Sequence, residues 1–237
     1  MPRRFAARFA ETAADTRAAQ ALRGQAFRGG LSDADAFDQF CTHVLVEDHL
    51  ENRVACAFRI QPFASGRVIA DSYAAQFYEL AGLKQYQGKL VEIGRFCIDP
   101  HYNDPDILRA AWGVLTTYVD ENNVKMLFGC SSFEGTASTA HLEAFALLNE
   151  RHLAPHQWLP KIKAPHVLRF SDSGKRPNQA AAQRAMPPLL RSYLAMGGWV
   201  SDHAVVDADL DTLHVFTGLE IAAIPEGRKR LLRAVAG

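Results

Sequence analysis

Hydrophobic residues follow strand spacing in some stretches of the chain and helix spacing in others. Two runs rich in β-branched residues, 42–48 and 54–60, flank the short stretch HLEN and predict a hairpin. Runs 91–98 and 124–132 predict two further strands, and apolar residues recur at helical spacing between them. Asp104 followed by Pro105 is typical of a helix start, and Asn122–Asn123 of a helix end. This unit predicts a right-handed crossover between parallel strands.

The remaining stretches predict a mixed fold. Helices are expected at 15–28, 73–83, 187–198 and over AHLEAFALLNERH, whereas WVSDHAVVD and TLHVFTGLEIAA are expected to form strands. A basic helix closes the chain. We see no repeat, low-complexity tract or long linker, so the pattern predicts one α/β domain over residues 1–237.

Composition narrows the class of protein. Hydrophobic residues make up 48% of the 237 residues and charged residues 22%, as in soluble globular proteins. The 26 basic residues balance the 26 acidic ones, which argues against a nucleic-acid binder that relies on a positive field. No apolar run approaches the roughly 20 residues of a membrane span. The N-terminal stretch has arginines but lacks the apolar core of a secretory signal.

Cysteine and histidine spacing argues against a metal site. The four cysteines lie far apart and none has C-x-x-C spacing, so we expect small buried hydrophobic side chains in a reducing compartment, the cytoplasm. The nine histidines show no ligand spacing on one helix face. Loops of the G-x-S-x-G, Walker A, G-x-G-x-x-G and H-E-x-x-H types are missing as well.

Charge is unevenly distributed along the neutral chain. Residues 1–30, 160–191 and the C-terminal stretch are basic, whereas 33–51 is acidic. These segments are either solvated faces or surfaces for an anionic partner, such as an acidic carrier protein or an anionic lipid surface. The C-terminal helix is expected either to lie on such a membrane surface peripherally or to dock on the protein body.

Glu92 and Arg95 are the most informative polar residues. They occupy the centre of a strand that should be buried, and an unpaired buried charge is costly. A bulge at Gly94 would break the alternation of side chains and let the two groups converge. Their pairing is either a buried ion pair without a chemical role or a catalytic unit. In the second interpretation Glu92 is a general base, and Arg95 orients it or binds a substrate carboxylate.

Several motifs together resemble the ornithine-lipid N-acyltransferases of the GNAT superfamily, which are similar in fold to acyl-homoserine-lactone synthases. They are Asp38-x-x-Cys41-x-His43, Glu92-Ile-Gly-Arg95-Phe-Cys and Gly129-Cys-x-Ser132-Phe-x-Gly135, within a likeness from about residue 15 to 220. The resemblance implies a mixed sheet whose central parallel strands splay apart to admit a pantetheine arm. It also implies transfer of a 3-hydroxyacyl chain from acyl carrier protein to the α-amine of ornithine.

The residues agree with a carrier-protein donor. Coenzyme A users in the superfamily have a glycine-rich loop before the crossover helix, where this chain has HYNDPD, so we expect no cofactor beyond the carrier's phosphopantetheine. The acidic stretch would meet the ammonium groups of ornithine, and Arg59 or Arg95 its carboxylate. Catalytic candidates are Glu92 and Arg95; substrate-binding candidates are Asp38, His43, Asp48, Arg59, Phe96, Cys97, Ser131 and Ser132.

Three alternatives stay open at this point. The same chemistry would act on glutamine instead of ornithine, or an acyl-homoserine-lactone synthase would use S-adenosylmethionine. A membrane-associated binding protein without catalysis is the non-enzyme alternative. A covalent route through Cys97 or Cys130 is disfavoured, because no histidine base is adjacent in the sequence.

Overall fold

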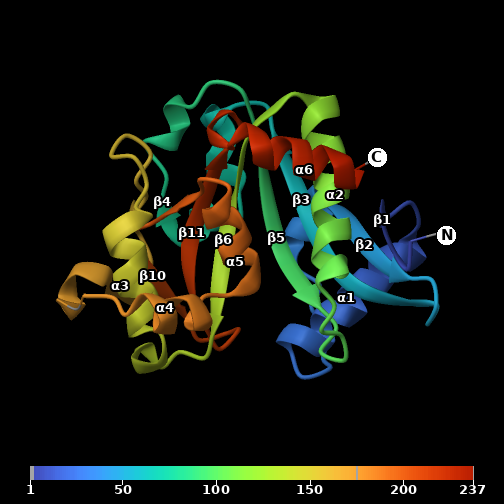
Figure 1. Ribbon diagram of the computed structural model, residues 1–237, viewed down its shortest axis with the longest axis horizontal. Coiled ribbons are helices and arrows are strands. Elements are labelled where there is room, and N and C mark those ends of the chain that lie inside the picture. The colour runs from blue at the N-terminus through green and yellow to red at the C-terminus, as the bar shows by residue number, and fades with distance from the viewer. Residues whose placement is uncertain (1–2, 175, 237) are drawn as a thin grey trace. The chain divides into compact units, whose positions relative to one another are not determined.

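The computed structural model describes residues 3–174 and 176–236 of the chain (Figure 1). Contacts between residues divide the chain into two compact units, each assembled from separate segments. Unit 1 comprises three segments: the N-terminal one, which ends at Pro62, then Ile93–Val124, and the one that begins at Glu226. Unit 2 holds Phe63–Glu92 and Lys125–Pro225. The prediction of a single domain stays a prediction.

Unit 1 is built on four neighbouring strands. Their order is β1 (Phe5–Phe9), β2 (Thr42–Asp48), β3 (Arg53–Phe63) and β5 (Lys89–Ile98), and both β1–β2 and β2–β3 are antiparallel. The residues of β5 up to Glu92 belong to unit 2. The second pair confirms the predicted hairpin. The unit also contains α1 (Ala13–Phe27), the 3₁₀ helix η1 (Ala36–Phe40), α2 (Pro105–Asn122) and α6 (Glu226–Ala236).

The two longer helices of unit 1 cover opposite faces of β1. Arg8 forms an ion pair with Asp15 of α1, whereas the ring of Phe9 lies 5.7 Å from that of Tyr118 of α2. Consecutive residues of a strand point to opposite faces, so α1 and α2 lie on either side of the sheet. The helix α6 packs on α2, where Arg233 forms an ion pair with Asp120.

The boundaries of α2 follow the sequence signals. Asp104 caps the helix by accepting a hydrogen bond from the backbone N–H of Asp106, and Pro105 occupies the first turn. Asn123 ends the helix in the left-handed conformation, which asparagine tolerates better than most residues. Both helix ends therefore confirm the prediction.

Unit 2 contains a second group of paired strands. There β6 (Val124–Glu134) pairs with β11 (Thr212–Glu220), which pairs with both β10 (His203–Asp207) and β9 (Trp199–Val200); β8 (Val167–Arg169) pairs with β10. A separate pair joins β4 (Tyr78–Glu79) to β7 (Lys161–Ile162). The helices are α3 (Leu142–Arg151), α4 (Gln179–Ala185) and α5 (Pro188–Ala195). Short 3₁₀ helices are η2 (Gly66–Asp71), η3 (Ala74–Gln76), η4 (Leu83–Gln85), η5 (Ser138–Ala140), η6 (Phe170–Ser173) and η7 (Ile221–Ala223).

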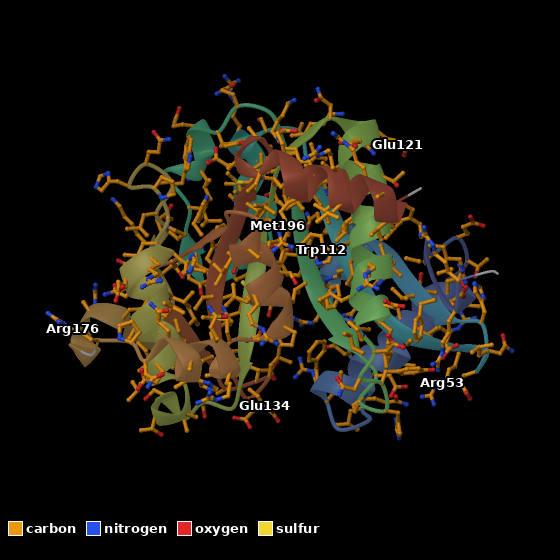
Figure 2. The ribbon with its side chains drawn as sticks, in the orientation of Figure 1. Arg53, Trp112, Glu121, Glu134, Arg176 and Met196 are labelled. Carbon is orange, nitrogen blue, oxygen red and sulfur yellow. The ribbon has the colours of Figure 1, made fainter. Side chains whose placement is uncertain are left out.

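Each unit buries its own apolar residues. In unit 1 a cluster forms around Ala19, Leu22, Leu45, Ala57 and Cys97. Unit 2 has two larger clusters, one centred on the aromatic side chains of β4, β6 and β11 and one between α3, α4 and α5. Figure 2 labels examples of both environments: Trp112 and Met196 are buried, whereas Arg53, Glu121, Glu134 and Arg176 are exposed.

The helix predicted at 73–83 is wrong. The chain there forms η3, then β4, then η4. The apolar side chains at helical spacing, such as Tyr78 and Leu83, are indeed buried, but in the core of unit 2. Tertiary contacts override the local pattern, because Glu92 binds the backbone N–H groups at the start of η3 and β7 pairs with β4.

Two further expectations need correction. The short strand β1 was not predicted, since its sequence FAARF lacks the β-branched residues typical of strands. All four cysteines are free, but only Cys56 and Cys97 are buried, while Cys41 and Cys130 are partly exposed. Within the described ranges, no helix is long and apolar enough to cross a membrane.

Candidate active site

Six charged side chains of unit 1 form a nearly buried network, which we call the Arg/Asp cluster. Its aspartates are Asp33, Asp35 and Asp38, and its arginines are Arg23, Arg59 and Arg95. The exposed fraction of these side chains is at most 10% for all of them except Asp35, which is 24% exposed. Burying this much charge is tolerated only because each group is paired.

Four elements position the cluster. Arg23 follows Ala19 and Leu22 on the buried face of α1, so helical spacing carries its guanidinium inward. The three aspartates come from the loop before and within η1, where Asp35 caps the turn by accepting a hydrogen bond from the N–H of Phe37. Arg59 and Arg95 come from the strands β3 and β5.

Arg23 ties the aspartate loop to α1. Its Nε lies 2.8 Å from a carboxylate oxygen of Asp33, and one terminal nitrogen lies 2.7 Å from Asp38. The other terminal nitrogen donates to the backbone carbonyl of Asp33 at 2.5 Å. With all its donor nitrogens engaged and none of its side chain exposed, Arg23 organises the loop rather than a ligand.

Arg59 and Arg95 both reach Asp35. Arg59 donates to the two carboxylate oxygens of Asp35 at 2.6 and 2.9 Å and to Asp38 at 2.5 Å. Arg95 donates to Asp35 at 3.2 Å and to Asp33 at 3.1 Å. Asp35 is therefore held by two arginines while remaining the cluster's most accessible carboxylate.

These contacts set the ionisation states in the cluster. Burial alone would raise the pKa of Asp38, but hydrogen bonds from Arg23, Gln20 and Arg59 outweigh it and lower that pKa. Burial likewise opposes ionisation of Asp35, yet Arg59 lowers its pKa, and the two aspartates in turn raise the pKa of Arg59. The carboxylates of Asp35 and Asp38 are ionised at neutral pH.

His43 lies beside the cluster as a neutral ring. Its Nε2 is 3.6 Å from a carboxylate oxygen of Asp38, and only 3% of the side chain is exposed. Burial lowers the pKa of His43 more than the nearby aspartate raises it, so the imidazole is uncharged at neutral pH.

The backbone of β5 is irregular at Arg95. Its φ of 53° lies in the left-handed region, which a residue with a Cβ seldom adopts. The sequence predicted a break of the alternation at Gly94, and the left-handed residue is in fact the next one. A Cβ at Gly94 would meet the Arg59 side chain at 3.6 Å, an ordinary contact. The cluster holds Arg95 in this conformation through its pairs with Asp33 and Asp35.

Glu92 is buried in unit 2, with 4% of the residue exposed. Each of its carboxylate oxygens accepts one hydrogen bond at 2.8 Å, from the backbone N–H groups of Tyr73 and Ala74. These bonds hold the carboxylate in a fixed orientation, as a general base requires.

The other predicted residues of unit 1 have different surroundings. Asp48 forms an ion pair with Arg4 at 2.7 Å and caps the β2–β3 turn, at the end of β2 away from His43. Cys97 packs in the core, its thiol donates to the carbonyl of Ala57, and burial raises its pKa to about 12. The ring of Phe96 stacks on that of Phe58 at 5.1 Å between centroids. The substrate-binding roles of these three residues stay predictions.

In unit 2, Ser131 and Ser132 lie side by side on β6 with different exposure. The Ser131 hydroxyl is buried and accepts a hydrogen bond from Thr217 at 2.9 Å, while Ser132 is exposed. The sequence did not indicate the buried contact between Tyr78 and His214, whose hydroxyl and Nδ1 lie 3.1 Å apart. Tyr78 was missed because its segment was predicted to be a helix.

Comparison with known proteins identifies the family. The chain is 30% identical to the L-ornithine N(alpha)-acyltransferase of Rhodobacter capsulatus, over 95% of this chain and 93% of that protein. The chain belongs to the L-ornithine N(alpha)-acyltransferase family. The acyltransferase of the same name from Brucella abortus is 28% identical over 92% of this chain and 84% of that protein.

The fold of this family member is that of the GNAT acyltransferases. Residues 17–113 match the acetyltransferase (GNAT) domain model. The structure of FeeM, an N-acyl amino acid synthase from uncultured soil microbes, superposes with a TM-score of 0.55 at 12% identity, covering 98% of this chain and 97% of that one. These findings confirm the predicted fold class and an acyltransferase enzyme, and they disfavour the non-catalytic binding protein.

Sequence reasoning found only part of the Arg/Asp cluster of this acyltransferase. Arg59, Arg95 and Asp38 were singled out, and Asp35 was expected to meet a cation. Arg23 and Asp33 were missed. The helical spacing of Ala19, Leu22 and Arg23 is a signal that would have found the arginine, since it places a charge on the apolar face of α1.

Proposed function

We propose that the protein transfers a 3-hydroxyacyl chain from the phosphopantetheine of an acyl carrier protein to the α-amine of ornithine, which gives lyso-ornithine lipid. The observation that carries the proposal is the 30% identity, over 95% of the chain, to a protein named for this acceptor. Glutamine is the competing acceptor, and the contacts of the described residues do not favour it.

The turn before α2 supports a carrier-protein donor. In this turn the Asp104 side chain accepts a hydrogen bond from the backbone N–H of Asp106, and Asp106 adds a second carboxylate in the first turn. Helix N-termini that bind the pyrophosphate of coenzyme A present free N–H groups in a glycine-rich loop. This turn has no glycine, and Asp104 already occupies the N–H of Asp106, so the turn offers a pyrophosphate few free donors. A carrier protein instead presents its single phosphate together with a protein surface.

Asp35 is the best candidate to meet a cationic group of ornithine. It is ionised at neutral pH and is the most exposed carboxylate of the Arg/Asp cluster. Arg59 and Arg95 fix both its oxygens, so the carboxylate is oriented before any ligand binds. Asp38, which the sequence favoured, is less accessible because Arg23, Arg59 and Gln20 surround it.

The reaction is direct attack of the amine on the thioester. Glu92 removes a proton from the α-ammonium, directly or through water, and the freed amine attacks the thioester carbonyl carbon. Backbone N–H groups near Gly94 hold the developing oxyanion. The C–N bond forms, the C–S bond breaks, and the carrier leaves as thiolate, whose reference pKa of about 8.5 makes it a good leaving group. The second proton of the attacking nitrogen passes to this thiolate, which leaves the amide and the free thiol. The buried thiol of Cys97 takes no part, since its pKa is raised to about 12.

The test combines product analysis with a charge-removing variant. Purified protein is incubated with 3-hydroxyacyl carrier protein and a mixture of ornithine and glutamine, and the products are identified by mass spectrometry. We expect acyl-ornithine alone. Glu92→Gln should lower its rate of formation by about 10²- to 10⁴-fold, as loss of a general base does. Glu134→Gln, at an exposed site on β6, is the matched control and should leave the rate unchanged.

A structural role of Glu92 must be separated from a chemical one. The amide of Glu92→Gln cannot accept both backbone hydrogen bonds, which costs about 1–3 kcal/mol of stability. The pH profile resolves this, because loss of a base removes the fall in rate at low pH, whereas loss of stability alone keeps it. Acyl-glutamine as the main product would overturn the acceptor assignment, and an unaltered acid limb would overturn the assignment of the base.

A further inference from the structure

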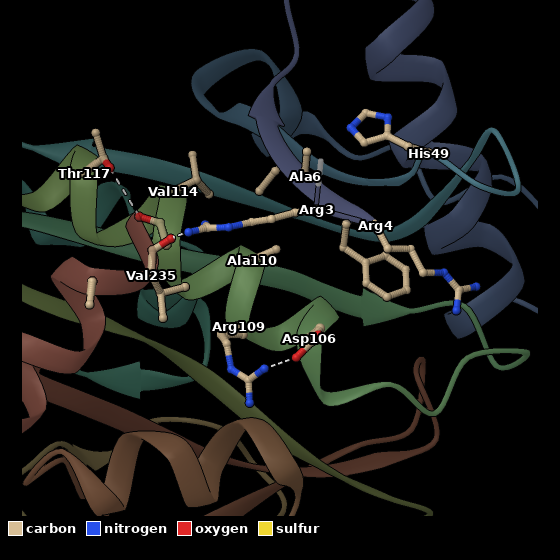
Figure 3. A pocket seen from close by; sticks show the side chains of 14 residues that line it. Arg3, Arg4, Ala6, His49, Asp106, Arg109, Ala110, Val114, Thr117 and Val235 are labelled. Carbon is tan, nitrogen blue, oxygen red and sulfur yellow. Dashed lines mark hydrogen bonds and ion pairs between the residues drawn. The ribbon is translucent and has the colours of Figure 1, made fainter. Parts of the chain in front are cut away.

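Unit 1 contains a cavity of about 610 Å³ between β1, α2 and the last turn of α6 (Figure 3). A volume of this size accommodates a small amphiphilic molecule. None of the residues that line it belongs to the Arg/Asp cluster, and neither Tyr73 nor Ala74, whose N–H groups bind Glu92, is among them. The proposed acyl transfer therefore leaves this cavity without a role.

Small apolar side chains form the walls of the cavity. Ala110, Gly113 and Val114 contribute one ridge of α2, Ala6 and Ala7 of β1 line the cavity as well, and Val235 closes one end (Figure 3). Residues of this kind leave room for a chain of methylene groups and offer it no polar partner. The walls favour an apolar ligand segment over a sugar or a nucleotide.

Positive charge surrounds this apolar recess. Three arginines line it, Arg3, Arg4 and Arg109, against the single carboxylate of Asp106. Arg109 pairs with Asp106, but both side chains are 57% exposed, and such surface pairs exchange readily for a ligand anion. Arg3 donates to the backbone carbonyl of Val235 at 2.6 Å and so has no carboxylate among its described contacts.

Arg4 is the most firmly held of the three. It forms an ion pair with Asp48 at 2.7 Å and lies 4.0 Å from Asp104. Its side chain is nevertheless 40% exposed and lines the cavity, although Asp48 and Asp104 engage all three of its nitrogens. The lining as a whole carries more positive than negative charge and suits an anionic group.

The edge strand β1 also contributes to the cavity lining. His49 donates to the carbonyl of Arg4 and Ala10 donates to that of His43, which fixes the ladder with β2. In such a ladder alternate residues direct their N–H and C=O groups away from the partner strand. Those residues are Phe5 and Ala7, and both line the cavity.

The outer face of α6 continues the apolar surface. Leu231 is 61% exposed, and helical spacing places it on the same side as Ala234, which lines the cavity. Arg228 and Arg230 flank Leu231 and are exposed. An exposed leucine between arginines is typical of a helix that lies in the headgroup region of an anionic bilayer.

We propose that this cavity binds one anionic phospholipid at a bilayer surface. The phosphate lies beside Arg109 and Arg3, one acyl chain follows the apolar walls, and Leu231 enters the surrounding interface. The basic residues and apolar walls of the cavity suit a single molecule with an anionic head and an apolar tail. A folded acidic protein instead needs a broad, even surface, since standard protein interfaces bury about 800 Å² per partner. The proposal goes beyond the proposed function and requires no acyl transfer.

The experiment measures lipid binding without any acyl donor. The probes are short-chain phosphatidylglycerol below its micellar concentration, studied by calorimetry, and vesicles with or without phosphatidylglycerol in phosphatidylcholine, studied by flotation. Arg109→Glu reverses one charge at the cavity, and Ala110→Trp fills it. Arg17→Glu, exposed on α1 at the opposite face of the sheet, changes the net charge equally and is the control.

We expect the anionic probe to bind and the phosphatidylcholine vesicles not to bind. Arg109→Glu should weaken binding at least about fivefold, since one basic residue near a membrane contributes about that factor. Ala110→Trp should weaken it as well, because the indole ring takes the space of the acyl chain. Three results would overturn the proposal: no binding of the anionic lipid, an equal loss in Arg17→Glu, or normal lipid binding by both cavity variants combined with a raised KM for the acyl carrier protein. The last would identify the cavity as a docking site for the carrier.

Discussion

The Arg/Asp cluster shows how single residues make buried charge tolerable. Arg23 and Asp33 are almost fully buried, and each carboxylate of the cluster accepts from at least two arginines. In an environment of low dielectric constant such pairs are strong, but removing one partner leaves the other charge without compensation. The stability of unit 1 therefore depends on every member of the cluster.

Asp38→Asn should destabilise the protein by about 3–5 kcal/mol at neutral pH, because Arg23 and Arg59 lose a shared carboxylate. The folded protein lowers the pKa of Asp38, so its contribution is complete above the ordinary aspartate value of about 3.9 and is lost as pH falls below it. The difference between the wild type and the variant should shrink between pH 6 and pH 2, as measured by urea unfolding.

A control and a contrary result define this prediction. Asp172→Asn removes a carboxylate at an exposed site and should change stability by less than about 0.5 kcal/mol at any pH. If the difference in the free energy of unfolding between wild type and Asp38→Asn were the same at pH 2 as at pH 6, the effect would come from packing and not from the charge of the carboxylate.

At the scale of single residues, the sequence predicted which charged residues belong to the candidate site better than it predicted which residues they contact. Arg59, Arg95 and Glu92 stand out because they are charged within apolar strands. Their partners are harder to find, since Asp33 and Asp35 lie in an irregular loop whose path has no periodic signal. The backbone N–H groups that bind Glu92 are invisible to any reading of side chains.

The secondary-structure elements were predictable where local signals and tertiary contacts agree. The helix α2 has a cap, a proline in its first turn, an apolar face and an asparagine end, and its observed bounds follow from them. In 73–83 the apolar spacing also fits a helix. The apolar side chains of this segment are instead buried in the core of unit 2 by a backbone that forms no α-helix. There the fold is set by partners distant in sequence, β7 and Glu92, which local periodicity does not reveal.

The irregular backbone of β5 gives a test at the element scale. Arg95→Gly and Arg95→Ala both lose the pairs with Asp33 and Asp35, but only glycine adopts a φ of 53° without strain. Glycine normally destabilises a strand relative to alanine. Here we expect Arg95→Gly to be more stable than Arg95→Ala by about 0.5–1 kcal/mol, measured by chemical denaturation.

The comparison between these two variants separates the effect of the backbone conformation from the loss of the ion pairs. Each lacks the guanidinium, so their difference reports the conformation of residue 95 alone. A variant pair at Leu90, in the regular part of the same strand, should show the usual order with alanine the more stable. Equal or greater stability of Arg95→Ala would mean that β5 relaxes to a regular conformation when the arginine is removed.

At the scale of the whole molecule, charge is balanced in sum but not in space. The chain has equal numbers of basic and acidic side chains. In unit 1, α6 presents four basic residues within a single helix, and in unit 2 the segment from β7 to α5 is also basic. A neutral molecule with such segments experiences no long-range attraction to an acidic protein, so recognition must depend on contacts at short range.

The rate with a carrier-protein donor should accordingly depend on salt, and the rate with a small donor should not. Raising NaCl from about 0.05 M to about 0.5 M shortens the Debye length from more than 10 Å to less than 5 Å, which screens contacts between the basic segments and an acidic carrier. We expect kcat/KM for 3-hydroxyacyl carrier protein to fall about tenfold. For the same acyl group on pantetheine alone, which lacks the protein surface, kcat/KM should change less than about twofold. Parallel curves for the two donors would show that the enzyme recognises only the pantetheine arm, and the basic segments would then be solvated faces without a role in donor binding.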